Sequence, residues 1–448
     1  MTNPFDRPVA GGVLPRSRRL CLLAASALLA GPALAMDYSV HTEVETEGQY
    51  DNNIQMLSED PTSATGLRVS PSLSLRAKSE TTEVSLDGIM WFRRYNRANF
   101  DSNDQQVSTS ITQHFDRSDL TLSAQGTRDT TLTSEYLDSG RVTDAGRHKQ
   151  YSLAPAWTGY IGERDLITLR GSYSQSKYDS DNYTDYTYWQ GSARWTRVMS
   201  ERLRLFLEAN YSKYQTAKNN LTIQESYTTS ADTGFQVGGS YAFTEQFSIT
   251  ALVGSSRDQT RSHLKYSQAE CDEKLTQFHN DAVASGNPAD LFWANNFGHA
   301  ICQMPEQEFN SRMSTLDASL NWSNELHQLS LEATQQSQPS SNGYTIRSSQ
   351  LNGTWAYQLW EQGSLSLDVT VGRNRAMGNN SDSIQAIQVN REFSYTALAY
   401  RQNLSENWSV NLSYQYRHQN YDKVDFEADS KAVYLGLSYK PRDRHWSR

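Results

Sequence analysis

The sequence predicts an all-β fold, a transmembrane antiparallel up-and-down β-barrel of about 18 strands, with 16 as the alternative count. Three observations favour it: segments in which apolar and polar residues alternate, short polar turns at regular intervals, and longer loops between those turns. The stretch over residues 192–210 illustrates the first two. After a polar turn, Leu203 and Leu205 fall on one face of the next strand, and Arg204 and Glu208 fall on the other.

Short polar turns recur about every 40 residues, with one interval about twice as long. Each of these turns contains a glutamate: Glu163, Glu201, Glu245, Glu325, Glu361 and Glu406. A similar repeat length is typical of propeller blades, but a blade holds four short strands, whereas each repeat here holds two strands of about 10–14 residues. One tight turn alternates with one longer loop, which is the asymmetry of outer-membrane barrels.

The polar faces of the strands are continuous and charged. A packed interior of such residues would cost too much free energy, so we expect a closed barrel that is apolar towards lipid and polar towards a water-filled lumen. An even strand count places both termini in the periplasm. Aromatic residues make up 11% of the chain, which fits girdles at the two membrane interfaces.

The first 35 residues have the features of a secretory signal peptide. A basic start leads into a short apolar run that ends in an A-x-A site, so we expect cleavage between Ala35 and Met36. The barrel is then expected over residues 36–440. A basic tail over residues 441–448 would hang in the periplasm, either as a docking point or as a disordered end.

The charge of the mature chain argues against nucleic acid as a partner. Removal of residues 1–35 takes away four arginines and one aspartate, a net charge of +3, so the formal charge falls from −9 to −12. Mean hydropathy is −0.70, which is too polar for a helical membrane protein. The expected partners are outer-membrane lipid and the outer-membrane assembly machinery, and the expected location is the bacterial outer membrane.

Charged residues also fall on the strand register that should face the lumen. These candidate pore-lining residues are Asp87, Arg93, Arg170, Arg194, Arg202, Arg204, Glu208, Glu332, Asp368 and Arg417. They either guide an anionic or highly hydroxylated solute or pair across strands as scaffolding inside the lumen. Arg194, Arg202 and Arg204 are the better candidates for guidance, because one hairpin places these three charges near the periplasmic rim.

A long extracellular loop is expected over residues 262–307, which contain no alternating segment. Two short helices are expected inside it, and Cys271 and Cys302 would close the pair by a disulfide, as an even pair of cysteines in an exported chain favours. The loop is either a lid, with Phe292 and Trp293 available to stack on sugar rings, or a packed, protease-resistant surface loop.

Motifs of catalysis do not occur. The nine histidines are scattered without H-x-x-x-H spacing, and there is no G-x-S-x-G, P-loop or G-x-G-x-x-G. We therefore expect no enzymatic activity, no metal site and no cofactor.

The opening of the mature chain carries a more specific pattern. A first strand ends in YDN at residues 50–52, Pro71 lies within the second strand, and a third strand ends in RRY at residues 93–95. In these features the chain resembles the family of β-barrel porins associated with exopolysaccharide clusters, including its exosortase-linked branch.

That resemblance implies a channel for export of an exopolysaccharide across the outer membrane, with a periplasmic polysaccharide-export protein as partner and the polysaccharide as substrate. Two alternatives stay open. One is a general or substrate-specific diffusion porin or uptake channel, and the other is a non-conducting, surface-structural barrel.

Overall fold

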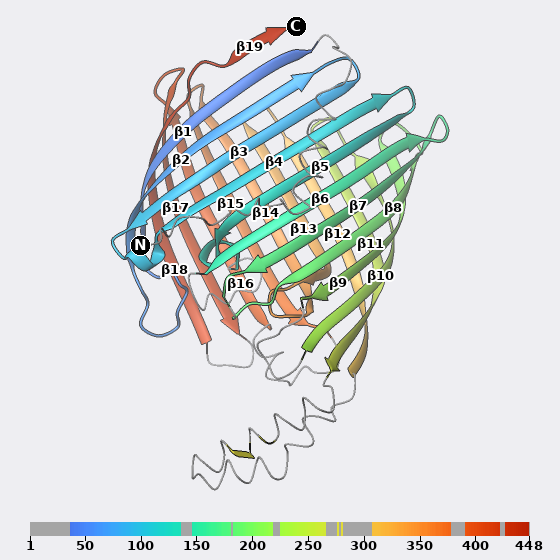
Figure 1. Cartoon of the computed structure of the whole chain (residues 1–448). Coiled ribbons are helices and arrows are strands. Elements are labelled where there is room, and N and C mark those ends of the chain that lie inside the picture. Colours follow the sequence, from blue (N-terminus) through green and yellow to red (C-terminus); the bar gives the residue numbers. More distant parts are fainter. Residues whose placement is uncertain are drawn as a thin grey trace, which may run out of the picture.

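A computed structural model describes residues 36–135, 146–180, 182–217, 225–265, 276, 279–280, 307–377, 390–421 and 426–447. Eighteen antiparallel strands, β1 to β18, follow one another around a barrel, and β18 pairs with β1 to close it (Figure 1). The predicted all-β, up-and-down barrel is therefore confirmed. Among the described residues no helix is both long and apolar enough to cross a membrane.

Strands β1 to β18 are long and are joined in sequence order, and the four-residue strand β19 follows them. They are β1 (Asp37–Asp51), β2 (Ala64–Lys78), β3 (Thr82–Tyr95), β4 (Ser102–Phe115), β5 (Ser118–Thr130), β6 (Arg147–Tyr160), β7 (Asp165–Tyr178), β8 (Tyr186–Val198), β9 (Leu203–Thr216), β10 (Glu225–Ala242), β11 (Phe247–Lys265), β12 (Gln307–Ser323), β13 (His327–Pro339), β14 (Thr345–Trp360), β15 (Gly363–Ala376), β16 (Arg391–Asn403), β17 (Trp408–Tyr421), β18 (Phe426–Tyr439) and β19 (Arg444–Ser447). The β3–β4 connection contains the short helical turn η1 (Ala98–Phe100), and the β5–β6 connection begins with α2 (Thr131–Ser134).

Apolar side chains point outward from the barrel. In β18, Val433, Leu435 and Leu437 are 44, 59 and 42% exposed, whereas Ser430 and Ala432 on the opposite register are buried. The same alternation continues around the barrel, so its outer surface is an apolar band. Such a surface is stable against hydrocarbon and would aggregate in water. The barrel therefore resides in the bacterial outer membrane, as expected.

Short turns join the strands at one end of the barrel, and the longer connections join them at the other (Figure 1). Aromatic rings gather beside the short turns. His327 stacks on Tyr357 with ring centroids 4.5 Å apart, and Trp322 and Trp355 flank the same histidine. Rings of this kind sit at the boundary between hydrocarbon and water, which marks the short-turn end as one membrane interface.

The carboxyl-terminal tail is paired, in contrast to the free end that the sequence led us to expect. Strand β19 lies antiparallel to residues 37–40 of β1, and Trp446 stacks on Tyr38 with ring centroids 5.4 Å apart. The physical reason is that β1 extends beyond the end of β18, so its first residues would otherwise present an open edge. Pro441 lies between β18 and β19, where it cannot donate to the ladder.

Some predicted features differ from the structure or fall outside the described residues. Strand β5 ends at Thr130, and α2 follows it directly, where continued alternation predicts more strand. Strand β11 continues to Lys265, inside the predicted extracellular loop. Residues 1–35, the two cysteines Cys271 and Cys302, and the aromatic pair Phe292 and Trp293 lie outside the described residues. The signal peptide, disulfide and lid therefore remain predictions.

Gly238 should be intolerant of a side chain, because a Cβ there would lie 2.0 Å from the carbonyl oxygen of Ala251 and 2.7 Å from Cα of Leu252. We expect Gly238→Ala to force β10 and β11 apart and to cost about 1–3 kcal/mol of stability. The measurement is the temperature at which the folded band converts to the unfolded band on a detergent gel. Gly48→Ala is the matched control, since nothing lies within 4 Å of that Cβ position. Equal conversion temperatures for the two variants would contradict the close approach.

Candidate functional site

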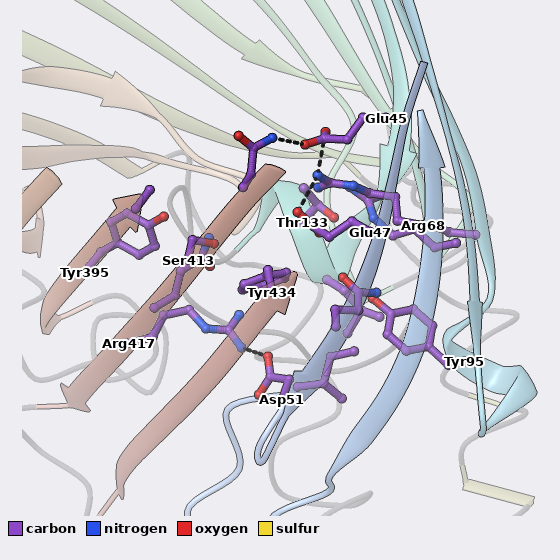
Figure 2. A pocket seen from close by; sticks show the side chains of 18 of the residues that line it. Glu45, Glu47, Asp51, Arg68, Tyr95, Thr133, Tyr395, Ser413, Arg417 and Tyr434 are labelled. Carbon is purple, nitrogen blue, oxygen red and sulfur yellow. Dashed lines mark hydrogen bonds and ion pairs between the residues drawn. The ribbon is translucent and has the colours of Figure 1, made fainter. Parts of the chain in front are cut away.

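A cavity of about 790 Å³ lies inside the barrel, between the wall formed by β1 to β3 and the wall formed by β15 to β18 (Figure 2). The inward register of each strand supplies its lining. Carboxylates come from β1, arginines come from β2, β3, β16 and β17, and tyrosines come from both walls. This cavity in the lumen is the candidate functional site.

Inward carboxylates of β1 pair with an arginine of β2. Arg68 Nη2 lies 3.1 Å from Glu45 Oε2 and 3.0 Å from Glu47 Oε2. The strand register explains the contact, because Glu47 is directly opposite Arg68 and Glu45 is two residues away on the same face. One guanidinium thus compensates two carboxylates, which leaves this part of the wall weakly acidic.

A second ion pair crosses the closing seam of the barrel. Arg417 of β17 pairs with Asp51 of β1 and donates a hydrogen bond to Ser430 Oγ of β18 at 2.8 Å. Ser430 Oγ in turn donates to Asp51 Oδ1 at 2.7 Å. The side chains of Arg417 and Asp51 are only 13 and 11% exposed. The three strands at the seam are therefore tied together on their inner face.

A third cluster lies at the ends of β3 and β4. Asp104 is buried, pairs with Arg93 and lies 3.0 Å from Arg147 Nη1. Ser102 Oγ also donates to Asp104 at 3.1 Å. Because two guanidiniums share one carboxylate, this cluster is weakly basic and offsets the acidic excess on β1.

Apolar residues of the long-loop end cover the cavity. Ile54, Phe100 and Leu132 line it and pack together with Ala64 and Tyr95. They come from the β1–β2 connection, η1 and α2, respectively. Three connections therefore fold into the barrel mouth and narrow it.

The β1–β2 connection is held inside by Asn53. Its Nδ2 donates to the carbonyl oxygens of Leu57 and Asp429, at 2.8 and 2.9 Å, and its Oδ1 accepts from the Leu57 N–H at 3.0 Å. Met56 follows with a positive φ of 54° and packs on Ala428. A non-glycine residue in this conformation is held there by its surroundings, so the connection is firmly placed.

The β13–β14 connection folds inward from the opposite wall. Tyr214 Oη of β9 donates to the carbonyl oxygen of Ser340 at 2.9 Å, and the N–H of Thr184 donates to the carbonyl oxygen of Ser341 at 2.7 Å. Ser341 Oγ donates to Glu135 Oε2 at 2.6 Å. Glu135 directly follows α2, so α2 connects the apolar cover on one wall to the connection from the other wall. The lumen is thus bridged at its long-loop end.

The structure places the predicted pore-lining residues in several parts of the barrel. Arg93 and Arg417 line the main cavity. Asp87 lines a smaller hollow of about 270 Å³ and lies 2.9 Å from Arg76. Glu208 and Glu332 line another of about 210 Å³.

The remaining candidates do not gather at one site. Arg194 pairs with Glu208 across β8 and β9. Asp368 accepts a hydrogen bond from Thr354 at 3.0 Å, and Arg170 and Arg204 lie on the inward registers of β7 and β9. Arg202 lies in the turn before β9, so it is not on a strand wall. Whether any of them guides a solute remains a prediction.

Sequence reasoning missed most of the cavity wall. Glu45, Glu47 and Arg68 were not among the candidates, although the alternating T-E-V-E-T-E of β1 was a usable signal for a carboxylate row on one face. Tyr395 and Tyr434 were missed because tyrosines recur on both faces of the strands.

One described group could hold a metal ion. His418, Glu427 and Asp429 lie close together, with His418 Nδ1 2.8 Å from Asp429 Oδ1. They occupy the outward registers of β17 and β18, away from the lumen.

Comparison with known proteins gave no matching family model and no matching curated protein. Three solved structures are similar to this chain over most of its length. The unliganded ferric citrate transporter FecA is 7% identical, with a TM-score of 0.47, over 92% of this chain and 79% of its own. The outer membrane protein OpdK of Pseudomonas aeruginosa is 11% identical, with a TM-score of 0.41, over 91% and 99%. OccK2 of Pseudomonas aeruginosa in complex with glucuronate is 9% identical, with a TM-score of 0.43, over 90% and 98%.

Loss of the seam arginine should destabilise the barrel. Arg417→Leu leaves the carboxylate of Asp51 without its guanidinium in a mostly buried position, so we expect a loss of about 3 kcal/mol. This loss of stability is measured as a lower denaturant midpoint for unfolding of the protein in detergent micelles. Arg442→Ala is the control, because Arg442 and its partner Glu406 are 86 and 84% exposed and should contribute little. If Arg417→Leu also left the midpoint unchanged, the ion pair would not contribute to closure.

Proposed function

We propose that this outer-membrane β-barrel channel is a selective diffusion channel for small, hydroxyl-rich solutes. The observation that carries the proposal is the set of connections folded into the lumen, from residues 53–56, η1, α2 and residues 340–343. A constriction formed by a channel's own connections is typical of pores that select solutes by size and chemistry.

The size of the cavity favours a small solute. A hollow of about 790 Å³ is in the range of sites that hold small molecules, about 300–1,000 Å³. Passage of a polymer would require α2 and the Ser340–Gly343 segment to leave the lumen together, since Glu135 and Ser341 are hydrogen-bonded. The inward-folded connections therefore favour the diffusion channel over polysaccharide export.

The chemistry of the lining favours hydroxyl groups over ions. Four arginines line the cavity, and each contacts a carboxylate, so little net charge faces the cavity: Arg68, Arg93, Arg401 and Arg417. Tyrosine, serine and amide side chains complete the lining: Tyr95, Tyr395, Tyr434, Ser364, Ser366, Ser413, Asn411 and Gln415. These groups donate and accept hydrogen bonds and offer ring faces, which suits a sugar-sized solute.

The test is reconstitution of the purified protein into planar bilayers and into liposomes. We expect small conductance steps with weak preference between cations and anions, and liposome swelling in neutral mono- and disaccharides. Swelling should be slower for sugar acids and amino sugars of the same size. Absence of conductance, strong ion selectivity, or conductance blocked only by long acidic polysaccharides would contradict the proposal. The last result would favour export.

Glu135→Ala should widen the lumen, because it removes the acceptor of the Ser341 hydrogen bond that joins α2 to the opposite connection. We expect larger conductance steps and a higher size limit in the swelling assay. Ser341→Ala should act in the same direction. Glu361→Ala, in a short turn at the other end of the barrel, is the control and should leave both values unchanged. Conductance of the wild-type size in Glu135→Ala would mean that this bridge does not limit passage.

A further inference from the structure

Arginines gather on the outer surface of the barrel near the long-loop end of β11 to β15. One of them, Arg261, is paired with Glu308 at 3.4 Å. The others are Arg257, Arg312, Arg347, Arg373 and Arg375. Each shares the outward register of its strand with an apolar residue of the lipid-facing band, as Arg257 does with Val253 and Arg373 with Val371. Their side chains therefore project from the outside of the barrel and not into the lumen.

The strand register sets these arginines against one another. Arg257 is directly opposite Arg312, and Arg347 is directly opposite Arg375. Arg347 Nη2 also reaches the main-chain oxygen of Arg312 at 3.4 Å, which links the two pairs. Like charges directly opposite on neighbouring strands destabilise a sheet unless an anion lies between them.

Carboxylates compensate only part of this charge. Glu392 lies 3.3 Å from Arg373 and 3.6 Å from Arg375. Within the described part of the chain, Arg257, Arg312 and Arg347 contact no carboxylate; Arg257 reaches the side-chain oxygen of Asn310 at 3.3 Å. Three guanidiniums are thus available to an anion from outside the protein.

The depth of the arginines matches the edge of the membrane. Arg257 lies ten residues beyond Phe247, where β11 leaves its short turn, and Arg373 lies ten residues beyond Gly363 in β15. At about 3.3 Å per residue and a tilt of about 45°, ten residues rise roughly 23 Å along the membrane normal. An apolar band is about 25 Å tall, so the arginines lie at the level of the lipid headgroups.

An apolar groove adjoins the arginines on the hydrocarbon side. It has a volume of about 560 Å³ and crosses the outer surface from β12 to β17. Leu316, Ala333, Leu351 and Val371 contribute its apolar part, and Arg373 lies at its polar end together with Glu392 and His418. The outer surface therefore has an apolar groove beside a cluster of guanidiniums, and this combination fits an acyl chain joined to a phosphate.

We propose that this surface binds a phosphorylated glycolipid of the outer leaflet. Its phosphates lie between the arginine pairs Arg257–Arg312 and Arg347–Arg375, and one acyl chain lies in the groove. Guanidinium groups bind phosphate oxygens in a bidentate manner, which relieves the repulsion between opposed arginines. A lipid is favoured over a soluble anion, because the groove opens towards hydrocarbon and only a membrane-resident molecule contacts both parts.

The test is native mass spectrometry of the purified, detergent-solubilised protein titrated with diphosphorylated lipid A. We expect retention of lipid A and at least tenfold weaker retention of the same glycolipid without phosphates. The variant Arg312→Gln with Arg347→Gln should reduce lipid A retention about tenfold. Lys213→Gln is the matched control, since Lys213 is a single outward cation ten residues beyond the start of β9.

The proposal would be overturned by equal retention of the two glycolipids, by wild-type retention in the double arginine variant, or by equal loss in the Lys213 control. Inorganic phosphate that displaces lipid A at equal concentration would also overturn it, because the site would then bind any phosphate. The gel conversion temperature of each variant must match the wild type, so that loss of lipid is not loss of fold. The conductance of the double variant should stay unchanged, which separates lipid binding from passage through the lumen.

Discussion

Closure of the barrel between β1 and β18 is the constraint on which the rest of the structure depends. In hydrocarbon every backbone donor and acceptor must be paired within the protein, and a sheet achieves this only when its first and last strands meet. Residues 44–51 of β1 pair with β18, and β19 pairs with residues 37–40. On the inner face, Arg417, Ser430 and Asp51 connect three strands across the same seam. Main-chain hydrogen bonds and side-chain ion pairs thus stabilise the same seam between β1 and β18.

The interior of this barrel is polar because it is built around water, but its charges mostly compensate one another. Arg68 forms ion pairs with Glu45 and Glu47, and Asp104 forms ion pairs with Arg93 and Arg147. A wall of paired charges keeps the lumen hydrated without a strong field that would favour one sign of ion. The connections folded inward from the long-loop end, and not the wall itself, therefore set the width. The inward-folded connections thus determine the width of the lumen, and the side chains of the strand wall determine its chemistry.

The two ends of the outer surface differ in chemistry. Aromatic rings such as His327 and Tyr357 gather beside the short turns, and opposed arginines such as Arg257 and Arg312 lie about ten residues further along the strands. An apolar band separates the two zones. This polarity gives the barrel a direction in the membrane: the long connections and arginines belong to one leaflet, and the short turns and both paired ends of the chain belong to the other.

By itself the sequence determined the strands, their two faces and the closed barrel, because alternation and turn chemistry are local and each strand carries its own signal. It also placed Arg93 and Arg417 on an inward register. The partners of these residues were decided only by the tertiary structure. Asp51 and Arg417 are 366 residues apart in the sequence and come into contact only when the barrel closes. Leu132 lies in α2 and lines the cavity, which no local pattern predicted. The long connections carry no period, so their inward packing follows from the space and the partners that the finished barrel provides. Local alternation in the sequence determines whether a side chain faces the lipid or the lumen, whereas closure of the barrel determines which residues it contacts.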